Sequence, residues 1–153
     1  AVEIIMLPPK LFTLRDCGLN KKSISERITK ILQKTKEQKD KIVLQHFLDF
    51  LNHGGKINVK IPSAEDIRQE IKKKRPLITL LTSNYLLGKK PKFNFHFNII
   101  TGIDKRFIYV NDPFPDARDG KHKYRIQEYL FGIYASAYGD IDNASIMKIR
   151  KVV

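Results

Sequence analysis

The chain of 153 residues contains one cysteine, Cys17, so no disulfide can form within it. It has no apolar run near the roughly 18 residues of a membrane-spanning helix. It also lacks a glycine-rich phosphate loop, a dinucleotide fingerprint and any histidine pair at metal-ligand spacing. We therefore expect no cofactor, no metal ion and no transmembrane segment. A single thiol suits a reducing compartment, which makes the cytoplasm the expected location.

The first ten residues, "AVEIIMLPPK", lack the basic region and the long apolar region of a signal peptide. They also lack an initiating Met and begin within what reads as a β-strand. We expect an engineered, processed or truncated start, from which a true N-terminal segment is missing.

Acidic residues are scarce, with 16 Asp and Glu against 29 Lys and Arg, for a net charge of +13. Such a charge permits binding to an anionic surface, and this is one candidate function. Nucleic acid is a disfavoured partner, because aromatic residues do not interleave with the basic runs as a base-stacking surface requires. The run "KKKR" at residues 72–75 lies at the C-terminal end of a predicted helix, where positive charges interact favourably with the helix dipole.

Hydrophobic periodicity and turn residues predict an ordinary single domain over residues 1–153. Strands are predicted at residues 2–9, 56–62, 76–87 and 144–153, with a β-hairpin at 94–112, and helices at 23–38, 41–55, 63–75 and 125–139. Residues 114–124 are predicted to be a polar loop. This order of elements favours an α+β fold with an antiparallel sheet packed against helices.

The hairpin, "NFHFNIITGIDKRFIYVNDP", alternates apolar and polar residues along its first strand. Phe93, Phe95 and Phe97 share one face, which we expect to be the core face. His96 then lies on the more polar face, two residues before Asn98.

A turn near Asp104 would pair residue 96 with residue 112 or 113, so Asp112 is expected to be a cross-strand or diagonal neighbour of His96. A carboxylate there would orient the imidazole and stabilise its protonated form, as the base of a nucleophilic triad requires. The alternative is structural: Asp112 before Pro113 simply starts a turn, and His96 is an ordinary strand residue.

Cys17 is the candidate nucleophile. It lies in "DCG", residues 16–18, just before a predicted helix whose capping box is Ser23 or Ser25 with Glu26. A thiol at a helix N-terminus ionises more readily than a free thiol. A Cys early in the chain, with His and Asp much later in an antiparallel sheet, is typical of papain-like hydrolases. The alternative is that Cys17 only fills apolar space.

Together, "DCG" at 16–18 and "HFNIITGIDKRFIYVNDP" at 96–113 resemble the bacteriocin-processing, double-glycine leader peptidase family and its standalone relatives. The resemblance implies a papain-like fold, a peptide or protein substrate, and hydrolysis or acyl transfer at an amide bond. It also implies Cys17 as the nucleophile, His96 as the general base and Asp112 as its orienter.

Two features depart from that family. Its members usually have a Gln six residues before the Cys, where this chain has Leu11, and no Gln precedes Cys17 at all. The residues after Cys17 are also rich in charge, whereas a buried nucleophile helix is apolar. A catalytically inactive papain-like domain that binds peptides is therefore the alternative to an active enzyme. The sequence leaves the substrate and the oligomeric state open.

Overall fold

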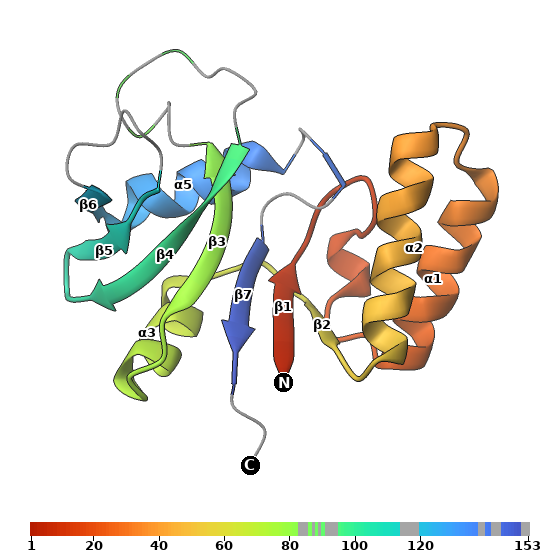
Figure 1. Cartoon of the computed structure of the whole chain (residues 1–153), viewed down its shortest axis with the longest axis horizontal. Coiled ribbons are helices and arrows are strands. Elements are labelled where there is room, and N and C mark those ends of the chain that lie inside the picture. Colours follow the sequence, from red (N-terminus) through yellow and green to blue (C-terminus); the bar gives the residue numbers. More distant parts are fainter. Residues whose placement is uncertain are drawn as a thin grey trace.

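A computed structural model describes residues 1–82, 86, 88, 90, 95–113, 120–137, 140–141 and 145–150 (Figure 1). The strands are β1 (Val2–Met6), β2 (Lys56–Val59), β3 (Leu77–Thr82), β4 (Phe95–Ile103), β5 (Phe107–Asn111), β6 (Lys121–Arg125) and β7 (Ser145–Ile149). The helices are the 3-10 turn η1 (Leu14–Asp16), α1 (Lys21–Lys34), α2 (Gln38–Asn52), α3 (Ala64–Lys72) and α5 (Ile126–Ser136).

The seven strands that the structure describes form one sheet in the order β2-β1-β7-β3-β4-β5-β6. β1 and β2 are parallel and are connected through α1 and α2, and every other neighbouring pair is antiparallel. The predicted α+β class is thus confirmed, with a mixed and mostly antiparallel sheet.

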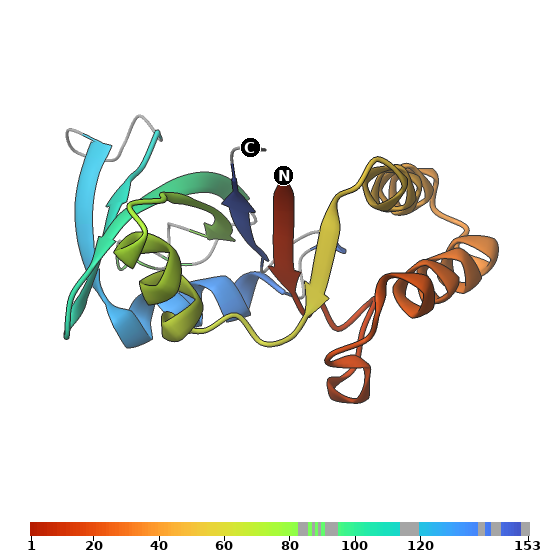
Figure 2. The ribbon, with the colours of Figure 1, turned by 90° about the horizontal axis from the view of Figure 1, so that it is seen from below.

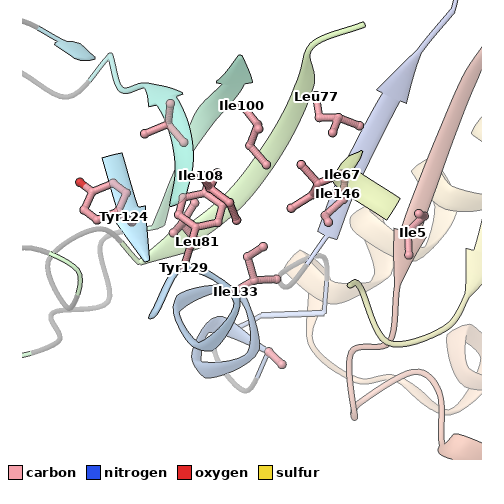
Figure 3. Packing of buried hydrophobic residues seen from close by; sticks show 12 residues of the cluster. Ile5, Ile67, Leu77, Leu81, Ile100, Ile108, Tyr124, Tyr129, Ile133 and Ile146 are labelled. Atoms are coloured by element: carbon pink, nitrogen blue, oxygen red, sulfur yellow. The ribbon is translucent and has the colours of Figure 1, made fainter. Parts of the chain in front are cut away.

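One hydrophobic core lies between the middle of the sheet and the helices α3 and α5. Figure 3 shows Ile100 and Ile108 from the hairpin strands packed with Tyr129 and Ile133 of α5. These side chains are fully buried. Since β4 carries the candidate histidine and the candidate aspartate directly follows β5, this core fixes the position of both residues.

A second core lies where α1 and α2 pack against β1 and β2. It contains Ile24 and Ile28 of α1 together with Met6 and Val59, which are paired across the two parallel strands. Ile5 and Met6 are adjacent residues of β1, and they point into different cores. Figure 2 shows α1 and α2 beyond the β2 edge of the sheet, away from α3 and α5.

The start of α1 differs from the prediction. The helix is capped by Asn20, whose side-chain oxygen accepts a hydrogen bond from the Ser23 N–H at 3.0 Å, rather than by Ser23 or Ser25. Asn is as good an N-cap as Ser, so the earlier cap prevails. Helix α2 ends at Asn52, within the helix predicted at 41–55, with His53 as its C-cap and Gly54 following at φ +88°.

The predicted polar loop at 114–124 is wrong over its last part. Lys121–Arg125 form the edge strand β6, in which Tyr124 is buried and the neighbouring Lys123 is exposed. Exposed lysines are usual on an edge strand, because their charge discourages pairing with another chain. The earlier part of that prediction, 114–119, lies outside the described residues.

The assignment of the two faces of β4 is also inverted. Phe97 is 51% exposed and Ile99 is 42% exposed, whereas Asn98 and Ile100 are completely buried. The buried face is the one that α3 and α5 cover, as the packing of Ile100 with residues of both helices shows. Figure 2 shows these two helices together on one side of the β3–β4 part of the sheet. The side chains of Phe93 and Phe95, predicted to share the Phe97 face, lie outside the described residues.

Candidate active site

His96 and Asp112 lie side by side, and the imidazole Nε2 is 2.7 Å from the carboxylate Oδ1. The predicted pairing of these two residues is confirmed. The His96 side chain is 17% exposed and that of Asp112 only 1%. The carboxylate is therefore buried, while the imidazole is partly accessible to solvent. A carboxylate on Nε2 makes that nitrogen the protonated one, which leaves Nδ1 to accept a proton.

The strand register explains this contact. Ile99 pairs with Asn111 and Ile100 with Val110, so continuing the register by one residue places Asp112 opposite Asn98. His96 is then the diagonal neighbour of Asp112. A bulge between Ile100 and Gly102 sets this register.

The turn of the hairpin is held by Asp104. Its carboxylate accepts hydrogen bonds from the backbone N–H groups of Arg106 at 2.6 Å and Phe107 at 2.7 Å, and from the Tyr109 hydroxyl at 2.7 Å. The Phe107 N–H is the largest reason why the pKa of Asp104 is lowered. An Asp at this position closes the turn, as its short acceptor side chain favours, and so fixes where β5 begins.

The backbone of Asp112 is anchored from the other side. Its N–H donates to the Gly120 carbonyl at 2.6 Å, just before β6. Gly120 has φ +70°, a conformation that residues with a side chain rarely adopt. Asp112 is therefore held between β4 and the start of β6.

Asn98 is a site residue that the sequence did not assign. Its Nδ2 donates to the second carboxylate oxygen of Asp112, Oδ2, at 3.1 Å. The available signal was its position, two residues from His96 on the same face of β4.

The surroundings of Asp112 on the helix side are aromatic. The Thr79 hydroxyl and the Tyr129 hydroxyl are 2.6 Å apart. Burial raises the pKa of Tyr124 to about 12, and the negative charge of Asp112 adds to this shift. Burial likewise raises the pKa of Tyr129. The hydrogen bond with Thr79 lowers that pKa, and the negative charge of Asp112 raises it further. Both phenols stay protonated beside the carboxylate.

Cys17 lies elsewhere. It is exposed and ends η1, where its N–H donates to the Leu14 carbonyl at 3.4 Å, and the next residue, Gly18, donates to the Val59 carbonyl at 3.1 Å. Val59 belongs to β2, the edge strand, which is four strand spacings from β4. At about 4.8 Å for each spacing, the separation is roughly 19 Å. The structure does not bring Cys17 to His96.

The motif "DCG" has a local structural role here. The Asp16 carboxylate accepts from the Thr13 N–H at 2.6 Å and the Thr13 hydroxyl at 2.9 Å, and forms an ion pair with Arg27 at 3.2 Å. The Thr13 N–H is the largest reason why the pKa of Asp16 is lowered. Cys17 lies just before α1, as predicted, but three residues before the Asn20 cap and outside the first turn of the helix.

Leu11, at the position of the expected Gln, is 1% exposed and belongs to the core around α1 and α2. An apolar side chain there supplies no hydrogen-bond donor for an oxyanion. Its carbonyl accepts from Arg27 Nε at 3.2 Å, which ties this segment to α1 rather than to β4.

Among the described residues, no group of three or more His, Cys, Asp or Glu side chains could hold a metal ion. Of the other histidines, His46 is exposed on α2, and His53 Nδ1 lies 2.7 Å from the Asp49 carbonyl at the helix end. None of the helices in the described ranges is long and apolar enough to span a bilayer.

Comparison with known protein families shows which family this chain belongs to. Residues 22–146 match the model of the Peptidase_C39 like family. The match contains His96 and Asp112 but begins five residues after Cys17. It confirms the resemblance to leader peptidases at the level of this wider family.

A similar solved structure is the crystal structure of a candidate C39-like peptidase from Bacillus anthracis, with 13% sequence identity and a TM-score of 0.43. The similarity covers 60% of this chain and 49% of that one, so the chain spans about half the length of that relative. No curated protein matches the sequence.

Proposed function

Because this chain belongs to the C39-like peptidase family, whose members are cysteine peptidase-like hydrolases, we propose that His96 and Asp112 form the acid–base half of a site that hydrolyses peptide bonds. The observation that supports this is the 2.7 Å contact between His96 Nε2 and Asp112 Oδ1 on adjacent strands. The substrate is a peptide or an unfolded segment of a protein.

In such a reaction, His96 Nδ1 takes the proton of a thiol, and the sulfur forms a bond to the carbonyl carbon of the peptide. The C–N bond then breaks, and the imidazolium gives its proton to the leaving amine. Water, deprotonated by the same imidazole, hydrolyses the thioester. Asp112 keeps Nε2 protonated and stabilises the imidazolium in both steps.

The nucleophile of this proposal is Cys17, the one cysteine of the chain. For its sulfur to reach Nδ1, the segment that follows Phe12 would have to leave β2 and cross the sheet. The Gly18–Val59 hydrogen bond and the Asp16–Arg27 ion pair hold that segment in place.

The same observations favour a second candidate function, a domain that binds peptides without cleaving them. The distant thiol and the apolar Leu11 both support it. In this case His96, at 17% side-chain exposure, contributes a polar contact to the bound peptide instead of a proton transfer.

A mixture of fluorogenic peptides, with cleavage and fluorescence anisotropy read in parallel, separates the candidates. A hydrolase loses cleavage in both Cys17→Ser and His96→Ala, while the exposed-histidine control His46→Ala keeps it. A binding domain shows saturable anisotropy that His96→Ala weakens, and no cleavage in any variant. A binding affinity that falls steeply with salt concentration and is unchanged in His96→Ala would instead identify a protein that binds an anionic surface. Absence of both cleavage and binding contradicts both proposed functions.

A further inference from the structure

We propose that Asn98 is a positioning residue, which holds the Asp112 carboxylate in the orientation that bonds His96. The proposal deepens the function proposed above, since it concerns the same histidine and aspartate.

Each carboxylate oxygen of Asp112 receives its own donor from β4. Oδ1 is 2.7 Å from His96 Nε2, and Oδ2 is 3.1 Å from Asn98 Nδ2. A carboxylate that is bonded at one oxygen can still rotate about the bond to its Cβ. A second donor on the other oxygen opposes that rotation, so the two bonds together fix the plane in which Oδ1 meets the imidazole.

Asn98 is itself held rigidly. It lies in β4 between two neighbouring strands and pairs with Thr79 of β3. Thr79 is completely buried, and its hydroxyl contacts that of Tyr129 on α5. A donor on a central strand is a firmer support than one on a loop.

Asn98 acts through Asp112 and not on a peptide. Its side chain is 0% exposed, and its Nδ2 donates to Asp112, which in turn bonds His96. It therefore has no access to a reacting atom, which distinguishes a positioning residue from a catalytic one.

The amide also carries a cost that an apolar residue would avoid. Asn98 Oδ1 is buried without a hydrogen-bond partner among the described residues. Turning the amide over would place this oxygen against Oδ2 of Asp112, where two acceptors repel. The bond to Asp112 thus fixes the amide orientation, and an unsatisfied buried acceptor is destabilising. If residue 98 only filled space, Leu at this position would make the fold more stable than Asn.

The experiment measures the tautomer of His96 by ¹⁵N NMR of the labelled full chain, which requires no substrate. In the wild type the Nε2–H tautomer should dominate. In Asn98→Leu we expect the ratio of Nε2–H to Nδ1–H to fall about tenfold, the scale of one lost charge-assisted hydrogen bond. The control Thr79→Val removes a buried hydroxyl beside Asn98 without touching Asp112, and it should keep the wild-type ratio.

A dominant Nε2–H tautomer that is equally populated in wild type and Asn98→Leu would overturn the proposal. Asn98→Ser, which is smaller and withdraws the donor from Oδ2, gives the same readout if the Leu variant does not fold. In an Asp112→Asn background, Asn98→Leu should have no further effect on His96, and an undiminished effect would also contradict a role through Asp112. Since the ratio is read without cleavage, a chain that cleaves nothing refutes the proposed hydrolase and leaves this test intact.

Discussion

His96 and Phe97 are neighbours in the sequence, yet their side chains lie on opposite faces of β4. Phe97 is 51% exposed, while the His96 side chain is 17% exposed and meets a carboxylate that is 1% exposed. Ile100, which shares the His96 face of β4 by the period of two, packs with Tyr129 and Ile133 of α5, so that side is the interior (Figure 3). The consequence is a hydrophobic face on β4 that contributes little to the stability of the chain.

This inversion is tested by comparing Phe97→Ser with Ile100→Ala in urea denaturation. Phe97→Ser should lower the free energy of unfolding by less than about 1 kcal/mol, because the ring is half exposed already. Ile100→Ala should cost about 2–5 kcal/mol, because it leaves a cavity against α5. Equal costs for the two variants would mean that Phe97 is buried in solution.

While Cys17 stays beside β2, it and His96 do not influence each other's chemistry, whereas the proposed hydrolase requires the two to meet. Iodoacetamide should alkylate Cys17 at the same rate in wild type and in His96→Ala across the neutral pH range, because roughly four strand spacings lie between them. A severalfold slower reaction in His96→Ala, with no change in the control His46→Ala, would show that the thiol does reach the imidazole.

The raised pKa of Tyr124 predicts a loss of stability at alkaline pH. Its pKa is raised to about 12 by burial, with help from the charge of Asp112. The folded state therefore favours the neutral phenol. This stabilisation is complete below the pKa of about 10 of an unfolded tyrosine and is lost as pH rises from there through about 12.

Tyr124→Phe is the matched variant for that test. It removes a hydroxyl that is buried without a hydrogen-bond partner in the described part of the chain, so stability at neutral pH should be unchanged or higher. The decline of the urea midpoint in the alkaline range should become shallower than in wild type. In Asp112→Asn, tyrosinate absorbance should show Tyr124 ionising at a lower pH. An unchanged alkaline decline in Tyr124→Phe would assign it to another group.

The lowered pKa of Asp66 predicts a loss of stability at acidic pH. Burial opposes its ionisation, but hydrogen bonds from Ser63 and Lys60 together outweigh burial and lower its pKa below the ordinary value of 3.8. Its stabilising contribution is present above that value and is lost as pH falls through the lowered pKa. Asp66→Ala should cost about 1–2 kcal/mol at neutral pH, because it removes the Asp66 half of the Ser63–Asp66 capping box of α3 and the ion pair with Lys60. The difference from wild type should shrink in acid, and a difference independent of pH would contradict this account.

The sequence predicted the His96–Asp112 contact because that contact is local. One hairpin carries both residues, and the Asp104 turn and the period of two along each strand nearly determine their meeting. It could not predict which face of β4 is covered, because α3 and α5 come from outside the hairpin. Asn98 escaped notice for the same reason: its role depends on burial.

The position of Cys17 could not be predicted, because it depends on a contact between distant segments. Gly18 docks on Val59, 41 residues further along the chain. Three letters, "DCG", look the same whether Asp16 caps a 3-10 turn or precedes a catalytic helix. The family match over residues 22–146 is consistent with this, since it does not extend to Cys17.

The alternation of Ile5 and Met6 along β1 has a consequence for how the chain opens. Contacts of the first residue belong to the core that supports His96, and contacts of the second to the core that holds η1, α1 and α2. Cooperative units of this kind exchange their amide hydrogens with different free energies of opening. The α1–α2 unit can therefore unfold transiently, releasing Cys17 from β2, while the strands that carry His96 and Asp112 stay protected.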